Sequence, residues 1–404
     1  MKMIKQRVDY TFKYNKDLGR HGWLRLTPAY SVRLVHNLLN GSKANQNILD
    51  PFSGTATTGL VAAEKGFNAS LYEINPFLVW FGNAKCKNYT KEEIDILKDK
   101  VSLIIACIDT NIDSCWIPPI FNIERWWNAE TLQIIARLRH LIVSHFGEPS
   151  PENEGNLIWI AFCRLVIETS SAAFNHVSMS FSEHVEHFNS EKIGVLFEGI
   201  FNLIAKSAVI EISGTSKVIE TDARYPQPNG IKYDIVITSP PYPNRMSYIR
   251  ELRPYMYWTK FLNSANEAGE LDWKAIGGTW GIATSRLKSW EVINKNLPDR
   301  LIKTFELISS SEKPNADLMG RYVFKFFDDI QLHLDNLRTV LNEGAELHYI
   351  IGNSSFYNVF VDSDMILKEI MENLGYSDIL IKPIRKRNSK KGLIEFCISA
   401  NWRK

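Results

Sequence analysis

A hydroxyl, two prolines and an aromatic ring follow directly on a short apolar run in residues 234–242 (DIVITSPPY). The run is rich in β-branched residues, which predicts a buried strand. Pro240 and Pro241 cannot continue the ladder of that strand, and each restricts the residue before it. The expected result is a stiff loop at the carboxyl end of a strand, where ligands bind in open α/β sheets. The Ser239 hydroxyl, the backbone carbonyls and the Tyr242 ring would suit the exocyclic amine of a nucleobase.

A second loop, rich in small residues, lies upstream in residues 48–59 (ILDPFSGTATTG). Its first residues predict another strand end, and a helix is expected from about residue 57 to residue 65. Gly54 allows the backbone to approach a ligand closely. Thr57 or Thr58 is expected to cap the helix. Together the two loops predict a site with two parts.

Both loops resemble motifs of the amino methyltransferases, enzymes that move a methyl group from S-adenosylmethionine to the exocyclic nitrogen of cytosine or adenine. Residues 239–242 (SPPY) resemble the S/D/N-P-P-Y/F motif of that family, and residues 50–58 (DPFSGTATT) resemble its D-P-F-x-G-T-G-T-T cofactor loop. Ala56 stands where the family usually has glycine. The resemblance implies S-adenosylmethionine as the cofactor. The cofactor-binding residues that it implies in this loop are Asp50, Phe52, Ser53, Gly54 and Thr55.

Two acidic residues at predicted strand ends complete the expected cofactor site. Glu73 closes a strand predicted over residues 68–73, and Asn75 and Pro76 then begin a helix as a cap and a first-turn proline. A carboxylate at a second strand end, about twenty residues past the loop, is the arrangement that binds ribose hydroxyls. Asp222 closes a third predicted strand and resembles the residue that holds the adenine amino group of the cofactor. A solvated strand end is the alternative for both acids.

The elements that must position these residues can be read from the rest of the chain. Apolar spacing predicts a helix over 321–341, a strand over 347–351, a helix over 364–374 and a hairpin of strands 379–384 and 393–399. An antiparallel hairpin that closes a mostly parallel sheet is the signature of the methyltransferase fold that the resemblance implies. We therefore expect the α/β class, with a class I (Rossmann-like), mostly parallel seven-stranded sheet, a C-terminal antiparallel hairpin and a helical insertion.

The resemblance divides the chain into a catalytic domain and two insertions. The catalytic domain is expected to comprise residues 1–85, 216–258 and 319–404, in which residues 21–30 resemble the segment before the cofactor loop of cytosine-N4 methyltransferases. Residues 86–215 are expected to form a helical insertion. The tryptophans expected in its core are Trp126, Trp127 and Trp159. Residues 259–318 form the second insertion and the candidate region for target recognition.

Composition predicts a cytoplasmic globular protein. Apolar residues make up 45% of the 404 residues, which is ordinary for a globular chain. No apolar run reaches the length of a membrane span and no apolar signal segment follows Met1, so no membrane partner is expected. The five cysteines are scattered without a CxxC, which indicates neither zinc nor disulfides. His176, His184 and His187 lack a companion cysteine or a clear carboxylate geometry, so no metal site is expected.

The net charge of +2 says nothing about nucleic acid, but the distribution of charge does. Residues 1–45 carry nine lysines or arginines against two aspartates. Further basic residues lie just past residue 242 and in the expected turn of the C-terminal hairpin. Basic clusters beside an amino methyltransferase motif favour a polyanion, and double-stranded DNA is the expected partner. The residues predicted to contact it are Arg245, Arg250, Arg385, Lys386 and Arg387.

The reaction that the resemblance implies is a direct methyl transfer to a flipped base. The Ser239 hydroxyl and the Pro240 carbonyl would hold the amino group and turn its lone pair toward the methyl group, while Tyr242 stacks on the base. No cysteine follows a proline, so the covalent route of carbon-5 cytosine methylation is not indicated. Serine in the first motif position favours N4 of cytosine, whereas aspartate or asparagine favours N6 of adenine.

Several alternatives stay open. An adenine-N6 DNA methyltransferase and an RNA amino methyltransferase use similar loops, and a protein-glutamine methyltransferase usually has asparagine where Ser239 stands. A catalytically dead DNA-binding subunit is suggested by Ala56. We find no convincing nuclease pattern of paired acids with a nearby lysine. If the protein belongs to a restriction–modification system, the cognate restriction endonuclease is therefore expected to be a separate chain.

Overall fold

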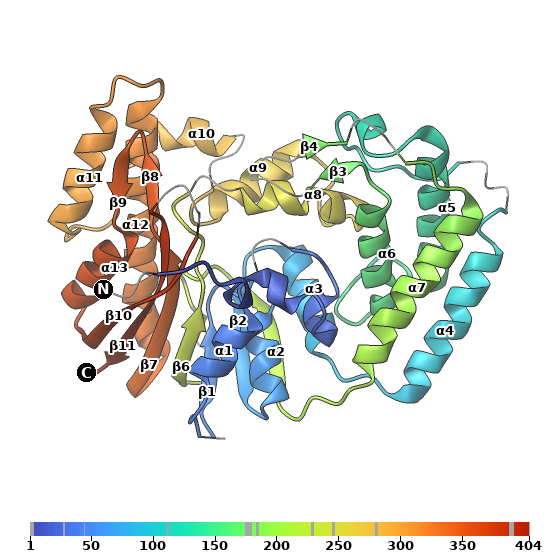
Figure 1. The fold of residues 1–404 in the computed structure, drawn as a ribbon, viewed down its shortest axis with the longest axis horizontal. Coiled ribbons are helices and arrows are strands. Elements are labelled where there is room, and N and C mark those ends of the chain that lie inside the picture. The colour runs from blue at the N-terminus through green and yellow to red at the C-terminus, as the bar shows by residue number, and fades with distance from the viewer. Residues whose placement is uncertain are drawn as a thin grey trace.

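The computed structural model describes residues 4–26, 29–43, 45–110, 112, 114–173, 180–182, 186–227, 230–244, 247–278, 282–387 and 392–403. A seven-stranded sheet forms its centre (Figure 1). In spatial order the strands are β10 (Tyr376–Lys386), β11 (Ile394–Trp402), β7 (Leu341–Gly352), β6 (Tyr233–Thr238), β1 (Asn47–Asp50), β2 (Asn68–Glu73) and β5 (Thr215–Glu220). Neighbours are parallel except at β11, which is antiparallel to β10 and to β7. The predicted fold class is confirmed.

Helices cover both faces of the sheet. They are α1 (Val32–Leu38), α2 (Thr57–Glu64) and α3 (Pro76–Cys86) on one face, and α12 (Ala316–Leu337) and α13 (Ser363–Asn373) on the other. Ile235 and Ile237 of β6 pack toward α1 and α2, whereas Val236 between them packs toward α12. Because both faces are buried, the strands near the centre are continuous apolar runs.

Residues 86–215, the expected insertion, form a mostly helical second layer beside α3, at the right of Figure 1. Its elements are α4 (Lys91–Ala106), α5 (Ala129–Phe146), α6 (Asn156–Glu168), α7 (Ser190–Ala208) and the short hairpin of β3 (Ala172–Ala173) and β4 (Ser180–Phe181). Trp126, Trp127 and Trp159 are buried in its core, as predicted. The core continues into α8 (Tyr248–Trp258), whose Trp258 packs edge-on against Trp127 at 5.8 Å between ring centroids. This layer therefore supports the helix that follows residues 239–242, the expected catalytic loop.

The remaining elements are short helices, one small hairpin and 3-10 turns. They are the helices α9 (Ala265–Lys274), α10 (Ile282–Leu287) and α11 (Asp299–Ser309), the hairpin of β8 (Ser354–Phe356) and β9 (Val359–Val361), and the 3-10 turns η1 (Val8–Tyr10), η2 (Phe12–Asn15), η3 (Gly19–Gly22), η4 (Ile123–Arg125) and η5 (Arg338–Val340). Helix α9 packs against α8, whereas α10 and α11 pack against α12. None of the helices in the described ranges is long and apolar enough to cross a membrane.

Some element boundaries differ from the predicted ones. The helix predicted over 321–341 begins at Ala316 and ends at Leu337, and the strand predicted over 347–351 begins at Leu341. Both hairpin strands are also longer than predicted, because β11 pairs with β7 from Glu346 to Gly352 and with β10 along almost its full length. Pairing in the sheet extends these strands beyond their apolar centres.

Arg20 attaches the N-terminal segment to the helical layer. Its buried guanidinium donates hydrogen bonds to the carbonyls of Lys85 and Lys87 at the end of α3, and of Ser207 and Ala208 at the end of α7. The last carbonyls of a helix lack partners within the helix, and a cation complements the negative end of the helix dipole. The N-terminal segment is thereby held where it borders the site.

Candidate active site

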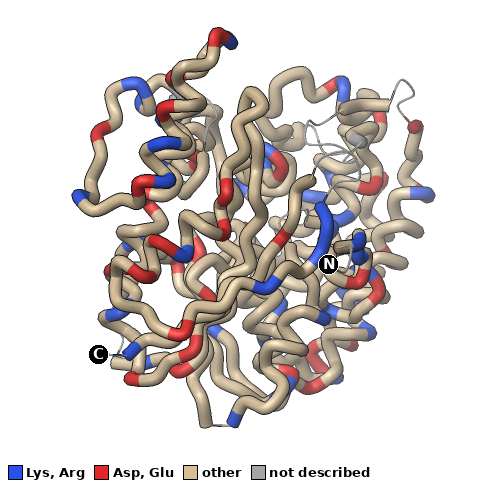
Figure 2. The backbone as a smooth tube through the Cα atoms, turned by 60° about the vertical axis from the view of Figure 1, so that its left-hand side comes forward, with Lys and Arg blue, Asp and Glu red and all other residues tan. Residues whose placement is uncertain are grey.

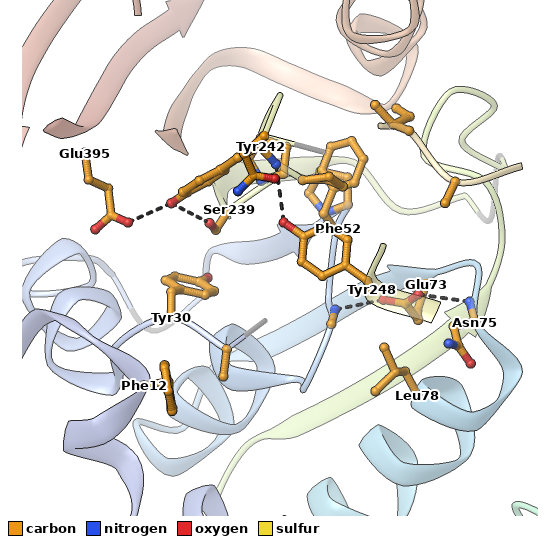
Figure 3. A pocket seen from close by; sticks show the side chains of 18 of the residues that line it. Phe12, Tyr30, Phe52, Glu73, Asn75, Leu78, Ser239, Tyr242, Tyr248 and Glu395 are labelled. Carbon is orange, nitrogen blue, oxygen red and sulfur yellow. Dashed lines mark hydrogen bonds between the residues drawn. The ribbon is translucent and has the colours of Figure 1, made fainter. Parts of the chain in front are cut away.

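A cavity at the carboxyl ends of the parallel strands collects most of the predicted site residues (Figure 3). Its volume is about 570 Å³, which lies within the range of small-molecule sites. Its wall comes from the cofactor loop, the end of β2, the catalytic loop, the N-terminal segment and the C-terminal hairpin. The predicted site residues in this wall are Phe52, Gly54, Glu73, Asp222, Ser239, Pro240, Pro241, Tyr242, Arg385, Lys386 and Arg387.

Asp50 lies behind the cavity wall and connects three elements. One carboxylate oxygen accepts hydrogen bonds from the Thr238 hydroxyl of β6 at 2.6 Å and from the Phe52 amide, and the other accepts from the Thr58 hydroxyl of α2 at 2.6 Å. Burial raises the pKa of Asp50 to about 6. Because both carboxylate oxygens accept hydrogen bonds inside the protein, Asp50 fixes residues 50–58, the expected cofactor loop, against β6. Ser53 and Thr55, also predicted to bind cofactor, are buried and lie outside the residues that line the cavity.

Ala56 occupies the turn between β1 and α2 in the left-handed region, with φ of 56°. A side chain there is strained, which explains why glycine suits this position. The Ala56 methyl is buried against Gly82 of α3, where an added Cβ would lie 3.2 Å from it. The prediction that Thr57 or Thr58 caps α2 is wrong: Ala56 is the N-cap and makes no side-chain cap bond, because the Thr58 hydroxyl is turned to Asp50.

Glu73 closes β2 and points into the cavity (Figure 3). One of its oxygens accepts a hydrogen bond from the Gly54 amide at 2.8 Å, and the other accepts from the amides of Ile74 and Asn75 at 3.0 and 2.9 Å. Desolvation raises the pKa of Glu73 to about 7, although these amides act in the opposite direction. Asn75 caps α3 as predicted, by accepting from the Phe77 amide. The carboxylate is thus held rigidly at the position expected for ribose recognition.

Asp222 follows β5 and shares its carboxylate with Arg224, which donates from both Nε and a terminal nitrogen. Phe52 lines the cavity, and its ring packs edge-on against the buried His333, with 4.8 Å between the ring centroids. His333 donates from Nδ1 to the Ala223 carbonyl at 2.7 Å, and its Nε2 accepts from a tyrosine hydroxyl on β7. Burial lowers the pKa of His333 to about 4, so the ring is neutral. This region offers an aromatic wall beside an acid, which fits an adenine ring.

The catalytic loop carries a directed chain of hydrogen bonds. The Ser239 hydroxyl lies 3.3 Å from the Tyr242 hydroxyl and 3.2 Å from the Ile350 carbonyl, and its one proton can be donated to either of these acceptors. The Tyr242 hydroxyl in turn donates to Glu395 of β11 at 2.9 Å (Figure 3). Burial and the nearby carboxylate raise the pKa of Tyr242 well above its usual range, so its hydroxyl keeps its proton. The Arg387 guanidinium lies 4.9 Å from the centre of the Tyr242 ring and covers one face of it.

The predicted DNA-contacting arginines of the hairpin lie elsewhere than expected. The prediction placed them in its turn, but Arg385 and Lys386 belong to strand β10, since the pairing with β11 continues that far. Arg385 pairs through two nitrogens with Glu395, at 2.7 and 3.0 Å, and Arg387 donates to the Asn353 carbonyl. Both face the cavity. Arg250 is half-buried in the first turn of α8, and Arg245 lies outside the described residues.

Three other predictions fall partly outside the described residues. His176, His184 and residues 279–281 of the second insertion are among them, as are Thr27 and Pro28 of the segment before the cofactor loop. His187 pairs with Glu130 at 2.6 Å. Among the described residues, no group of three or more histidines, cysteines or acids could hold a metal ion.

Glu395 is the main site residue that sequence reasoning missed. It is 5% exposed and lines the cavity. The available signal was an acid alone between apolar residues of a predicted strand, a position that burial makes costly without partners. Tyr30 was missed as well: it lines the cavity, and its hydroxyl bonds to the Thr58 hydroxyl. Residues 6–8 and 10–13 also line the cavity, and nothing in their sequence pattern indicated it.

The sheet order and the closing hairpin are those of a class I methyltransferase fold, and the two loops meet at one edge of the sheet. No protein-family model matches the chain. The chain is similar to the Type II methyltransferase M.BsoBI of Geobacillus stearothermophilus, with 22% identity over 93% of this chain and 82% of that protein. It is similar at 21% identity to the Type II methyltransferases M.AvaI of Nostoc sp. (strain PCC 7120) and of Anabaena variabilis, over 94% of this chain and 84% of each relative.

Proposed function

We propose that the protein is a DNA methyltransferase of a restriction–modification system, which moves a methyl group from S-adenosylmethionine to the N4 amine of a flipped cytosine. Similarity to Type II methyltransferases over more than nine-tenths of the chain supports the reaction class and DNA as the substrate. Double-stranded DNA would be the partner, and a separate cognate restriction endonuclease would act on the same site. The cytoplasm is the expected location.

The shape and chemistry of the cavity fit the cofactor. Glu73 offers two fixed acceptor oxygens for the ribose hydroxyls, and the Gly54 backbone leaves room beside it. Asp222 and the Phe52 ring would bind the adenine, with Asp50 positioning the loop from behind. Bound there, the cofactor supplies an activated methyl group. The contribution of the protein is to orient that group toward the amine and to exclude water.

The hydrogen bonding of the Ser239 hydroxyl is the observation that supports an amine as the target. Its single proton is committed to Tyr242 or to the Ile350 carbonyl, and both of these acceptors lie within 3.3 Å. Its lone pairs are therefore available to accept from the N–H of an amine. The Pro240 carbonyl would accept the second N–H, and the Tyr242 face not covered by Arg387 would stack on the base. Such acceptors turn the lone pair of the amine toward the methyl group.

Cytosine is preferred over adenine because serine, rather than aspartate or asparagine, stands first in the motif. Adenine-N6 methylation by the same loop is the second candidate, since it needs the same acceptors. A catalytically dead subunit is disfavoured by the fit of Ala56 against Gly82, which leaves the cavity open. Calorimetry with S-adenosylmethionine tests that alternative directly, because a dead subunit would keep DNA affinity without binding the cofactor.

We further propose that residues 1–85, 216–258 and 319–404 form the catalytic domain, with residues 86–215 as a supporting helical insertion. Residues 259–318 would read the DNA sequence. Two features support this division. Residues 274–276 of the second insertion line the cavity, whereas residues 148–199 carry eight acids against two basic residues, a poor surface for phosphates.

The test is to express the protein in a host without related enzymes and to analyse its DNA by mass spectrometry of nucleosides. We expect N4-methylcytosine, and we expect it to disappear in the Ser239→Ala, Tyr242→Ala double variant. N6-methyladenine as the only product would replace cytosine by adenine as the target. Unmodified DNA from a host that makes the folded protein, with modified RNA in its place, would contradict the DNA assignment.

A further inference from the structure

The carboxylate of Glu395 stands at the end of a chain of hydroxyls that begins at the proposed target amine. Ser239 can donate to the Tyr242 oxygen, for which the Ile350 carbonyl is the alternative acceptor, and Tyr242 donates to Glu395. Glu395 also receives two hydrogen bonds from Arg385, one at the oxygen that accepts from Tyr242 and one at the other oxygen, and these fix the direction of the carboxylate. The side chains of Arg385 and Glu395 are only 18% and 7% exposed. A buried carboxylate so placed requires an explanation beyond holding the hairpin, because its ordinary place is the surface.

We propose that Ser239, Tyr242 and Glu395 form a proton relay that removes the proton released by the target amine during methyl transfer. This inference rests on the proposed function and deepens it by naming the residue that finally receives the proton. The relay serves cytosine N4 and adenine N6 equally, since either amine must lose one proton when it gains a methyl group.

The proton balance is complete within the named groups. The N–CH₃ bond forms as the S–CH₃ bond breaks, and the sulfur keeps the bonding electron pair. The amine releases one proton to the Ser239 oxygen, Ser239 passes its own proton to the Tyr242 oxygen, and Tyr242 passes its proton to Glu395. Glu395 becomes a neutral acid, so the positive charge brought in by the cofactor is matched by one carboxylate. Arg385 remains beside it, and Glu395 later returns the proton to water through the cavity.

The distances suit such a transfer. The oxygen of Tyr242 lies 2.9 Å from Glu395, an ordinary hydrogen bond, and 3.3 Å from the Ser239 oxygen, a long one. Catalytic hydrogen bonds often tighten only when substrate is bound. Tyr242 is suited to pass a proton on rather than to hold a charge, because its raised pKa disfavours the phenolate. Arg387 over the Tyr242 ring limits rotation of the ring away from this line.

Two single variants and their combination test the relay. Tyr242→Phe keeps the ring for stacking and removes the hydroxyl, and Glu395→Gln keeps the shape and removes the proton acceptor. We expect each to lower the single-turnover methylation rate about 100-fold, a usual contribution of general acid–base catalysis. The dissociation constants for S-adenosylmethionine and DNA should change less than about threefold, because neither variant removes a group that binds them. The double variant should be no slower than the slower single variant, because both changes interrupt one chain.

Matched control variants lie outside the site. Tyr376→Phe removes a buried tyrosine hydroxyl from the far end of β10, where it bonds to the Leu334 carbonyl. Glu369→Gln removes a carboxylate that pairs with Arg300 on the surface of α13. Both should methylate at the wild-type rate. Thermal unfolding and cofactor binding show whether each variant is folded.

The wild-type enzyme supplies a test that does not depend on any variant. Because the protons move as the methyl group is transferred, the single-turnover rate in heavy water should fall about twofold or more. An unchanged rate in heavy water would overturn the relay. So would variants that methylate at nearly the wild-type rate, or a double variant whose loss is the product of the two single losses. An inactive wild-type protein would instead contradict the proposed function, so the two failures can be told apart.

Discussion

Glu73 shows how a single residue is prepared for its role by its surroundings. Three amide N–H groups hold its carboxylate at the end of β2, yet burial keeps its pKa at about 7. Near neutral pH the proton is therefore easily removed. A ribose diol donates two hydrogen bonds, which the ionised form accepts better than the protonated form. Binding of the cofactor should consequently favour loss of the proton.

The first prediction concerns the pH dependence of cofactor binding. The bound state favours ionised Glu73 and the free state has a pKa of about 7, so affinity should rise as pH is raised through this value. Between pH 6 and pH 8 the dissociation constant of S-adenosylmethionine should fall about tenfold, as expected for one group over one pKa unit. Isothermal titration calorimetry in buffers of different ionisation enthalpy measures both the affinity and the protons released.

Glu73→Gln should weaken binding about tenfold or more at pH 8 and should remove most of the pH dependence. The surface variant Glu92→Gln on α4 serves as its control and should behave as the wild type. A pH dependence that survives in Glu73→Gln would assign it to another group, of which the buried Asp50, with its pKa of about 6, is the nearest.

At the scale of elements, the turn between β1 and α2 shows what it costs the protein to have Ala56 where the family motif has glycine. Ala56 adopts φ of 56°, which costs an alanine about 1–2 kcal/mol relative to the right-handed region. Its buried methyl recovers about 0.8 kcal/mol, and alanine also loses less chain entropy on folding than glycine. These contributions nearly cancel. The gap left by Gly82 on α3 is what allows the methyl to fit.

The second prediction follows from this balance. Ala56→Gly should change the free energy of unfolding by less than about 1 kcal/mol and leave the cofactor dissociation constant within about threefold of the wild-type value. Ala56→Val should destabilise the protein by about 2 kcal/mol or more, since a β-branched residue in the left-handed region also lacks space against α3. Urea unfolding monitored by circular dichroism measures both. A large gain in activity in Ala56→Gly would show that the alanine impairs catalysis.

At the scale of the whole molecule, lysines and arginines of the N-terminal segment and of β10 lie around the cavity. The amide of Lys386 donates to the carbonyl of Lys5, which places the N-terminal segment beside β10. Figure 2 shows blue segments gathered near the N-terminus. Arg385 and Arg387 are committed to contacts inside the cavity, so DNA affinity should depend on other cations. Arg250, in the first turn of α8 next to the catalytic loop, is the predicted one that stays best placed for a phosphate.

The third prediction concerns salt dependence. Arg250→Ala should weaken DNA binding about equally for specific and non-specific sequences. It should also reduce the slope of log affinity against log salt by about 1, as expected for the loss of one phosphate contact. Fluorescence anisotropy with labelled duplexes at several salt concentrations measures this slope. Arg403→Ala, which removes an arginine paired with Asp378 at the end of the chain, should leave the slope unchanged.

Arg385→Ala is expected to behave differently from Arg250→Ala. It should lower the methylation rate with little change in the salt slope, because its guanidinium fixes Glu395 rather than contacting a phosphate. Equal changes of the salt slope in both variants would indicate that Arg385 contacts a DNA phosphate after all.

Local features of the site were predictable from sequence because each depends on residues adjacent in the chain. The prolines after β6, the glycine turn after β1 and the Asn75 cap are decided by backbone geometry over a few residues, and the structure has each strand end where it was expected. Apolar spacing predicted several individual helices and strands, and the resemblance to amino methyltransferases added the mostly parallel sheet, its closing hairpin and the helical insertion. The predicted cap of α2 was wrong because the Thr58 hydroxyl bonds to Asp50 instead. The two residues come together only when the turn between β1 and α2 has folded.

The sequence alone determined the residue types of the two loops and the strand ends from which the loops start. Only the tertiary structure decided which distant residues complete the site. Tyr242 and Glu395 are 153 positions apart, and they meet because β11 inserts antiparallel between β7 and β10. The same strand pairing places Arg385, which was expected to contact DNA, beside the buried Glu395 as its ion-pair partner. Contacts of this kind depend on strand register and burial, which the pattern of one strand does not contain.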